Sequence, residues 1–134
     1  MNAVFADTFY WIALTNIKDL AHEQAQSMSP DALCTTEEVL TEYLNYFAAW
    51  GPNFRLKASM NVHTMRETRT VQIVPQTPVS FSVGLLLYEA RLDKGYSLTD
   101  CISMETMRYQ GITDVLTNDA HFEQEGFHAL FRQS

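Results

Sequence analysis

Short apolar stretches alternate with longer helical segments along the chain, and this alternation limits the fold more than any other feature of the sequence. The short stretches have the length and composition of buried strands, and Gly or Pro ends several of the segments between them. No two-residue hairpin turn joins consecutive strands. This order is typical of βαβ units, so the sequence predicts an α/β fold with a mainly parallel sheet flanked by helices.

The predicted elements follow one another without a repeat, a low-complexity tract or a linker. Strands are expected at residues 3–7, 32–36, 71–74, 114–117 and 127–131. Helices are expected at residues 8–16, 19–28, 37–50, 53–68, 79–95 and 99–111. With 134 residues and 46% hydrophobic content, the chain is expected to form one compact domain, residues 1–134.

Composition bounds the compartment and the class of partner. No apolar run approaches the about 18 residues of a membrane span, and no signal peptide is recognised, so a soluble cytoplasmic protein is expected. Cys34 and Cys101 are far apart within apolar patterns and are predicted to be buried free thiols. The net charge of -7 argues against a broad nucleic-acid-binding face but leaves room for a small site where carboxylates hold divalent cations.

Acidic residues follow two of the predicted strands. Asp7 ends the first strand, and Asp119 follows the fourth in the stretch VLTNDAHF. Ligands of parallel sheets bind outside the carboxyl ends of the strands, so both aspartates are expected at one rim. Asp100 opens the predicted helix 99–111, which is also expected to begin at that rim, although this depends on how the helix is connected to the sheet.

Glu42 lies inside the predicted helix 37–50, where it caps nothing. At about 100° per residue it falls beside the apolar stripe and can reach inward, although a solvated flank is an equal alternative. Asn45, three residues on, shares this face and is placed to hydrogen-bond Glu42. The stripe itself consists of Val39, Leu40, Tyr43, Leu44, Phe47 and Trp50.

Each aspartate also has a purely structural interpretation as a helix or turn cap. Asp100 follows Ser97 by three residues, which is the spacing of a capping box. The stretch TTEE has the same pattern, with Thr35 and Glu38 at the required spacing, and Glu38 is therefore left out of the candidate site.

The order of these motifs resembles the PIN-domain nucleases, especially the VapC-type ribonuclease toxins. A strand ending in DT, the helix VLTEYLNYF about 35 residues later, LTDCISM and LTNDAHF occur in the family's order and cover most of the chain. The resemblance implies a five-stranded parallel sheet, metal-dependent endonucleolytic cleavage of RNA, a small antitoxin that covers the site, and a homodimer. The family's acidic quartet falls on Asp7, Glu42, Asp100 and Asp119, and its neighbouring polar positions fall on Thr8, Asn45, Thr117 and Asn118.

The chemistry of phosphodiester hydrolysis agrees with such a quartet. Mg²⁺ and Mn²⁺ take oxygen ligands, activate water and stabilise charge on the phosphate, and carboxylates are suitable ligands. We expect Asp7 to be the central ligand, with Glu42 and Asp100 beside it on a first ion. Asp119 is expected to support a second ion or the attacking water, and the number of ions stays open.

Other polar and aromatic groups have weaker functional interpretations. Four scattered histidines match no zinc motif and are predicted to be structural or at the surface, namely His22, His63, His121 and His128. Four bases in one helical stretch form either a solvated face or an RNA-backbone track, namely Arg55, Lys57, Arg66 and Arg69. The run Phe9, Tyr10 and Trp11 is predicted to be core, or in part a partner surface.

Three function classes remain open from the sequence. The first is a toxin-type endoribonuclease with an antitoxin, and the second is a PIN-like RNA-processing nuclease without one. The third is a catalytically inactive nucleic-acid-binding module of the same fold, or a flavodoxin-like nucleotide binder. The intact acidic set speaks against the third class, and the glycines form neither a dinucleotide-binding motif nor a P-loop.

Overall fold

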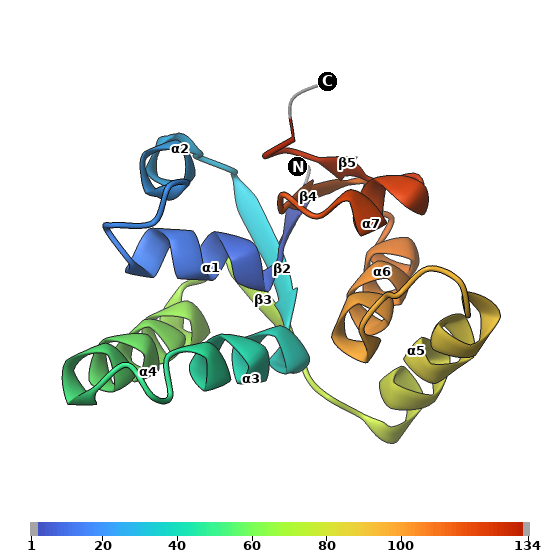
Figure 1. The fold of residues 1–134 in the computed structure, drawn as a ribbon, viewed down its shortest axis with the longest axis horizontal. Helices are drawn as coiled ribbons and strands as arrows, with labels where there is room; N and C mark the ends of the chain where they lie inside the picture. The colour runs from blue at the N-terminus through green and yellow to red at the C-terminus, as the bar shows by residue number, and fades with distance from the viewer. Residues whose placement is uncertain (1–2, 133–134) are drawn as a thin grey trace.

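The computed structural model describes residues 3–132, and its centre is a five-stranded sheet in which every pairing is parallel (Figure 1). The order across the sheet is β3-β2-β1-β4-β5. This confirms the predicted α/β fold with a five-stranded parallel sheet. The strands are β1 (Ala3–Ala6), β2 (Ala32–Thr36), β3 (Val71–Val74), β4 (Asp114–Leu116) and β5 (His128–Ala129).

Helices lie on both sides of this sheet. In Figure 1, α1, α3 and α4 lie on one side and α5, α6 and α7 on the other, as right-handed crossover connections require. None of the helices within residues 3–132 is long and apolar enough to span a membrane. The helices are α1 (Thr8–Thr15), α2 (His22–Ser27), α3 (Glu37–Tyr46), α4 (Pro52–Glu67), α5 (Pro78–Ala90), α6 (Leu98–Gln110) and α7 (Ala120–Gln124).

Helix α3 ends four residues before the predicted position at residue 50. The N–H groups of Ala48 and Trp50 donate to carbonyls three residues earlier, so residues 47–50 form a turn. The turn stacks the buried ring of Phe47 on Phe54 of α4, with centroids 5.4 Å apart. Tertiary packing of one aromatic side chain therefore ends the helix earlier than local propensity indicates.

Other elements also differ from the prediction. α2 starts at His22, three residues after the expected start at residue 19, and β5 covers only two of the five residues expected at 127–131. α5 ends at Ala90 and not near Gly95, because Arg91 leaves the helix and its guanidinium binds Glu125. The short helix α7 was not expected, and it begins after Asp119, whose side chain accepts a hydrogen bond from the backbone N–H of His121.

The core agrees with most of the predicted apolar positions. Cys34 and Cys101 are buried free thiols, as predicted, and burial raises the pKa of each to about 11. Tyr10 and Trp11 are buried, while Phe9 is half-buried. Two members of the predicted α3 stripe are not core residues: Leu44 is 37% exposed and Trp50 is 42% exposed. Trp50 lies beyond the end of the helix, so the helical stripe does not extend to it.

The sheet brings the predicted rim residues together. β1 and β4 are neighbours at its centre, and Ala6 pairs with Leu116 at their carboxyl ends. Asp7 and Thr117 come next in the two chains, and the Thr117 hydroxyl donates to Asp7 Oδ2 at 2.8 Å. Asp7 and Thr117 are 110 residues apart in the sequence, and the pairing of β1 with β4 brings them into contact.

Candidate metal centre

All four predicted acids line one cavity of about 430 Å³ at the carboxyl ends of β1 and β4. Asp7 comes from the end of β1, Glu42 from α3, Asp100 from α6 and Asp119 from the start of α7. Other lining residues include Thr8, Phe9, Ser97, Thr117 and Asn118. Three of the four predicted polar neighbours are therefore at this cavity, and the fourth, Asn45, lines an adjacent one that also contains Glu42.

Asp7 is the most buried of the four acids, with 7% of its surface exposed. Burial, with the nearby Asp100 and Glu42 carboxylates, raises its pKa to about 7, although the hydrogen bond from Thr117 acts in the opposite direction. Asp7 precedes α1, but among the described residues its side chain makes no capping hydrogen bond to that helix. The capping interpretation of Asp7 is therefore wrong.

Glu42 is held at the cavity by a single neighbour. The hydroxyl of Thr8, in the first turn of α1, donates to Glu42 Oε1 at 2.5 Å. The Glu42 side chain is otherwise exposed to solvent, so both interpretations made from its place on the helix describe part of its surroundings. Thr8 follows Asp7 directly, and this short link couples the positions of two carboxylates.

Asp100 and Asp119 both cap helices and line the cavity. Asp100 and Ser97 form the predicted capping box, with hydrogen bonds of 3.0 and 3.3 Å. Asp119 is the N-cap of α7, and its own N–H donates to the Thr117 hydroxyl. Burial, followed by the charge of Asp119, raises the pKa of Asp100. Capping fixes the backbone of these aspartates at the rim, and each still has carboxylate surface facing the cavity.

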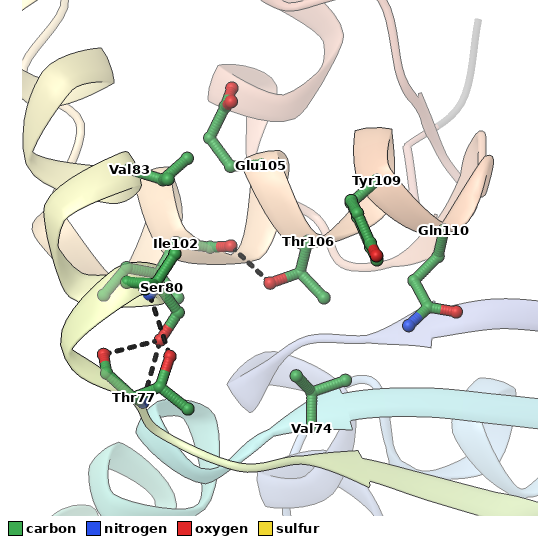
Figure 2. A pocket seen from close by; sticks show the side chains of 10 residues that line it. Val74, Thr77, Ser80, Val83, Ile102, Glu105, Thr106, Tyr109 and Gln110 are labelled. Carbon is green, nitrogen blue, oxygen red and sulfur yellow. Dashed lines mark hydrogen bonds between the residues drawn. The ribbon is translucent and has the colours of Figure 1, made fainter.

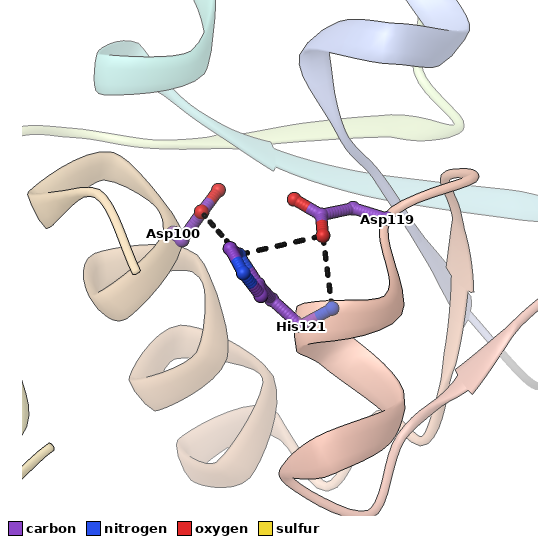
Figure 3. A group of neighbouring side chains, drawn as sticks. All are labelled: Asp100, Asp119 and His121. Atoms are coloured by element: carbon purple, nitrogen blue, oxygen red, sulfur yellow. Dashed lines mark hydrogen bonds and ion pairs between the residues drawn. The ribbon is translucent and has the colours of Figure 1, made fainter. Parts of the chain in front are cut away.

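His121 joins two of the acids, which the sequence did not predict. Figure 3 shows its ring between Asp100 and Asp119. Its Nδ1 lies 3.4 Å from Asp119 Oδ1 and 3.8 Å from Asp100 Oδ2, and one ligand atom from each residue fits within 4.8 Å. Within residues 3–132 this buried nitrogen has no hydrogen-bond partner. The ring of Tyr96 lies 5.0 Å away, centroid to centroid, and limits its movement.

The signal for His121 was present in the stretch LTNDAHF. A residue two positions after an N-cap lies in the first turn of the helix and can face the capping side chain. The prediction of a structural or surface role fits the other three histidines. His22 is buried with Nδ1 2.7 Å from the Ala13 carbonyl oxygen, while His63 and His128 are exposed.

This cavity has the composition expected of a divalent metal site. None of the described side chains that line it belongs to Lys or Arg, so four carboxylates line one cavity without a permanent positive charge among them. Carboxylates that line one cavity repel one another unless a cation or a proton lies between them. Oxygen donors of this kind suit Mg²⁺ or Mn²⁺, and the His121 nitrogen adds a ligand that transition metals accept.

The groove between α5 and α6 differs from this site. It encloses about 260 Å³, and Figure 2 shows Val83, Ile102 and Tyr109 among the side chains on its walls. The helices meet closely here because Gly84 has no Cβ, which would collide with Ile102. Its one acid, Glu105, pairs with Arg108. Among the residues described, the groove holds no comparable group of ionisable side chains.

The four predicted RNA-binding bases lie away from the acids or make internal contacts. Arg55 donates to the carbonyl of Ala48, and Lys57 donates to the carbonyl of Thr15 at the end of α1. Arg66 and Arg69 are exposed near the end of α4, just before β3 begins. Because all strands are parallel, this is the edge opposite the carboxylates. Contact of these residues with RNA stays a prediction.

Comparison with known proteins agrees with this geometry. No curated protein sequence matches the chain. Among solved structures, Mycobacterium tuberculosis VapC20, described as a sarcin-ricin-loop-cleaving toxin, superposes with a TM-score of 0.79 and 26% sequence identity. The alignment covers 92% of this chain and 95% of that one. The family profile of the PIN domain matches residues 4–127, and the chain therefore belongs to the PIN-domain family.

Proposed function

We propose that this protein is a metal-dependent endoribonuclease that hydrolyses RNA phosphodiester bonds, and that it is the toxin of a type II toxin-antitoxin pair. The observation that carries the proposal is the convergence of Asp7, Glu42, Asp100 and Asp119 on one cavity. Membership of the PIN-domain family supports a nuclease, and the similarity to VapC20 supports an RNA substrate.

The cofactor we propose is Mg²⁺ or Mn²⁺, with Asp7 as the central ligand. Glu42 and Asp100 would hold the first ion with it, while Asp119 would support a second ion or position the attacking water. When bound, a divalent ion supplies charge stabilisation for the phosphate and lowers the pKa of a water molecule.

The protein's own residues orient these ligands. Thr117 donates to Oδ2 of Asp7 and orients this carboxylate at the wall of the cavity. Thr8 does the same for Glu42. Asn118 is exposed between Thr117 and Asp119, where it can contact an incoming phosphate or ribose. Such supporting groups typically contribute about 10-fold to 100-fold in metal affinity or activity.

The proposed partners follow from the toxin assignment. A small antitoxin would cover the acidic cavity and keep RNA out, two copies of the chain would form a homodimer, and the protein would act in the cytoplasm. A PIN-like RNA-processing nuclease without an antitoxin is the second candidate. It is distinguished by expression of the chain alone, because a toxin arrests growth and coexpression of its antitoxin restores it.

Incubation of the purified protein with structured RNAs tests the nuclease assignment. A sarcin-ricin loop hairpin and an unrelated hairpin are supplied with Mg²⁺, with Mn²⁺ or with EDTA. Cleavage is expected with either metal and not with EDTA, and it should disappear in Asp7→Asn. Equal cleavage by wild type and Asp7→Asn would indicate a contaminating nuclease and reject the assignment.

A further inference from the structure

A second cavity of about 360 Å³ adjoins the carboxylate cavity and shares Glu42 with it. It lies between α3 and the starts of α5 and α6, and we call it the side pocket. Leu98 and Thr99 line the side pocket, while their neighbours Ser97 and Asp100 line the carboxylate cavity. An RNA strand with one phosphate at the carboxylates would therefore have an adjacent nucleotide at the side pocket.

Glu38 lines the side pocket, and it does not make the contact that the sequence predicted for it. The sequence predicted that it would complete a capping box with Thr35, but this is wrong, because the helix starts one residue later than that pattern requires. Thr36 is the N-cap and accepts from the Val39 N–H at 3.1 Å, while the Thr35 hydroxyl donates to the carbonyl of Ala6. The carboxylate of Glu38 is left without a capping role.

One carboxylate oxygen of Glu38 is buried without a hydrogen bond. Among the described residues, Oε2 has no donor, although buried polar atoms are normally satisfied. Burial, followed by the charge of Glu37, raises the pKa of Glu38. The neighbouring Glu37 is satisfied, since its Oε1 accepts from the backbone N–H of Gln76 at 2.6 Å. Among the described residues, Oε2 of Glu38 is therefore an acceptor that lacks a donor at the edge of the proposed active site.

The other walls of the side pocket have the groups that hold an unpaired nucleobase. Phe81 is 44% exposed and presents an aromatic ring, on which bases stack. Asn45 and Gln76 add amide groups that both donate and accept. Single-stranded RNA is recognised in this way, by stacking together with hydrogen bonds to the base edge.

We propose that the side pocket binds a nucleobase of the RNA substrate beside the scissile phosphate, with the Glu38 carboxylate accepting from its Watson-Crick edge. The base favoured is guanine, because it presents two adjacent N–H donors that match the two oxygens of a carboxylate. Adenine and cytosine each place an unprotonated ring nitrogen next to their amino group, and that nitrogen repels a carboxylate. The proposal rests on the proposed ribonuclease function and assigns Glu38 as its specificity-determining residue.

Sequencing the ends produced from a randomised RNA library tests the proposal. Wild type, Glu38→Gln and Glu38→Ala are compared in Mn²⁺, with Glu67→Gln as a matched control on the exposed end of α4. Wild type should favour guanine within two nucleotides of the cut. Both Glu38 variants should lose this preference by about 10-fold or more while their melting temperatures stay at the wild-type value, and the control should match wild type in base preference.

Synthetic substrates sharpen the test. Inosine lacks the exocyclic amino group of guanosine. Wild type should therefore cut a substrate with inosine more slowly than the same substrate with guanosine, whereas Glu38→Gln should cut the two substrates at equal rates. A cleavage pattern without a guanine preference, or one that Glu38→Gln leaves unchanged, would overturn the side pocket while the nuclease assignment stands. Unchanged cleavage with lost inhibition by an antitoxin would assign the side pocket to that protein. Absence of any metal-dependent cleavage would reject both proposals.

Discussion

Two buried carboxylates in this protein have opposite surroundings. Glu125, at the end of α7, has a side chain that is only 5% exposed. Its carboxylate accepts hydrogen bonds from the guanidinium of Arg91 at 2.8 Å, the guanidinium of Arg108 at 2.6 Å and the hydroxyl of Tyr96 at 2.8 Å. Asp7 is 7% exposed, accepts a hydrogen bond from the hydroxyl of Thr117 and lies near the carboxylates of Asp100 and Glu42.

The pKa values express this difference. Burial raises the pKa of Glu125, but hydrogen bonds from Arg91, Arg108 and Tyr96 outweigh burial and lower it to about 2. Burial and neighbouring acids raise the pKa of Asp7 to about 7. The protein thus neutralises the acid that holds α7 against α5 and α6, and it leaves the acids of the cavity to be neutralised by something outside the chain.

The largest expected effect comes from Asp7→Asn. The amide keeps the shape but removes the anionic ligand, so RNA cleavage in Mn²⁺ should fall by more than about 100-fold, beyond what supporting groups contribute. The measurement is single-turnover cleavage, with Asp31→Asn, at an exposed position, as the control. Near wild-type cleavage by Asp7→Asn would remove Asp7 from the site.

The same variant makes a prediction about stability. The folded pKa of Asp7, about 7, lies above its ordinary value of 3.8, so the unfolded chain releases this proton first. Asp7 therefore lowers the free energy of unfolding progressively as pH rises from about 4 to about 7. In EDTA, Asp7→Asn should lose this part of the pH dependence and melt at a higher temperature than wild type near pH 7.5. A lower melting temperature there would contradict the repulsion argument.

A smaller effect is expected from His121→Asn. An imidazole nitrogen next to Asp100 and Asp119 should favour Co²⁺ over Mg²⁺, since nitrogen donors suit the later transition metals. Co²⁺ affinity, followed by its visible absorption, should fall by about 10-fold or more, and Mg²⁺ affinity should change less. His63→Asn, at an exposed position on α4, is the matched control. Equal losses for both metals would place His121 in a positioning role.

Glu125→Gln tests the other side of the comparison. The two arginines are 37% and 38% exposed, so solvent screens them, and the loss of stability should be about 1–2 kcal/mol, below that of a fully buried pair. The pKa of Glu125 is lowered to about 2 from 4.5, so its contribution is present above about pH 4.5 and is lost as pH falls towards 2. Glu89→Gln, exposed on α5, should melt like wild type. Matching acid unfolding curves for Glu125→Gln and wild type would contradict this account.

The parts of the fold that depend on local pattern were predictable. Apolar runs without hairpin turns indicate the strands, and the convergence of parallel strand ends predicts Asp7 and Asp119 at one rim. Helix ends were less predictable, because they depend on tertiary partners. α3 ends where Phe47 turns to stack on Phe54, and α5 ends where Arg91 reaches Glu125.

The candidate site was predictable where it depends on local sequence pattern and not where it depends on tertiary contacts. The helical wheel left an inward and a solvated position open for Glu42. It could not show that Asn45, nearly one turn on, lines the side pocket. His121 was missed because its role depends on where α7 packs against α6, which no local pattern contains. Glu38 was given a capping role because its spacing from Thr35 fits a capping box, whereas the N-cap of α3 is Thr36.

The smallest effect is expected from Arg69→Glu, at the opposite edge from the acids. β3 alone separates Arg69 from the rim by about 13 Å at about 3.3 Å per residue, which exceeds the Debye length of about 8 Å at physiological salt. RNA affinity should therefore fall by less than about 3-fold at 0.15 M salt and by more at 0.01 M, where the Debye length is about 30 Å. Arg132→Glu is the comparison, since Arg132 donates to the carbonyl of Asn118 at the cavity and should affect affinity more at both salt concentrations. Fluorescence anisotropy of a labelled RNA measures the affinity of both variants at both salt concentrations, with Asp7→Asn as the common background. A large loss for Arg69→Glu at 0.15 M salt would show that RNA extends around the molecule to the edge where the strands begin, and the basic track predicted from the sequence would then be correct.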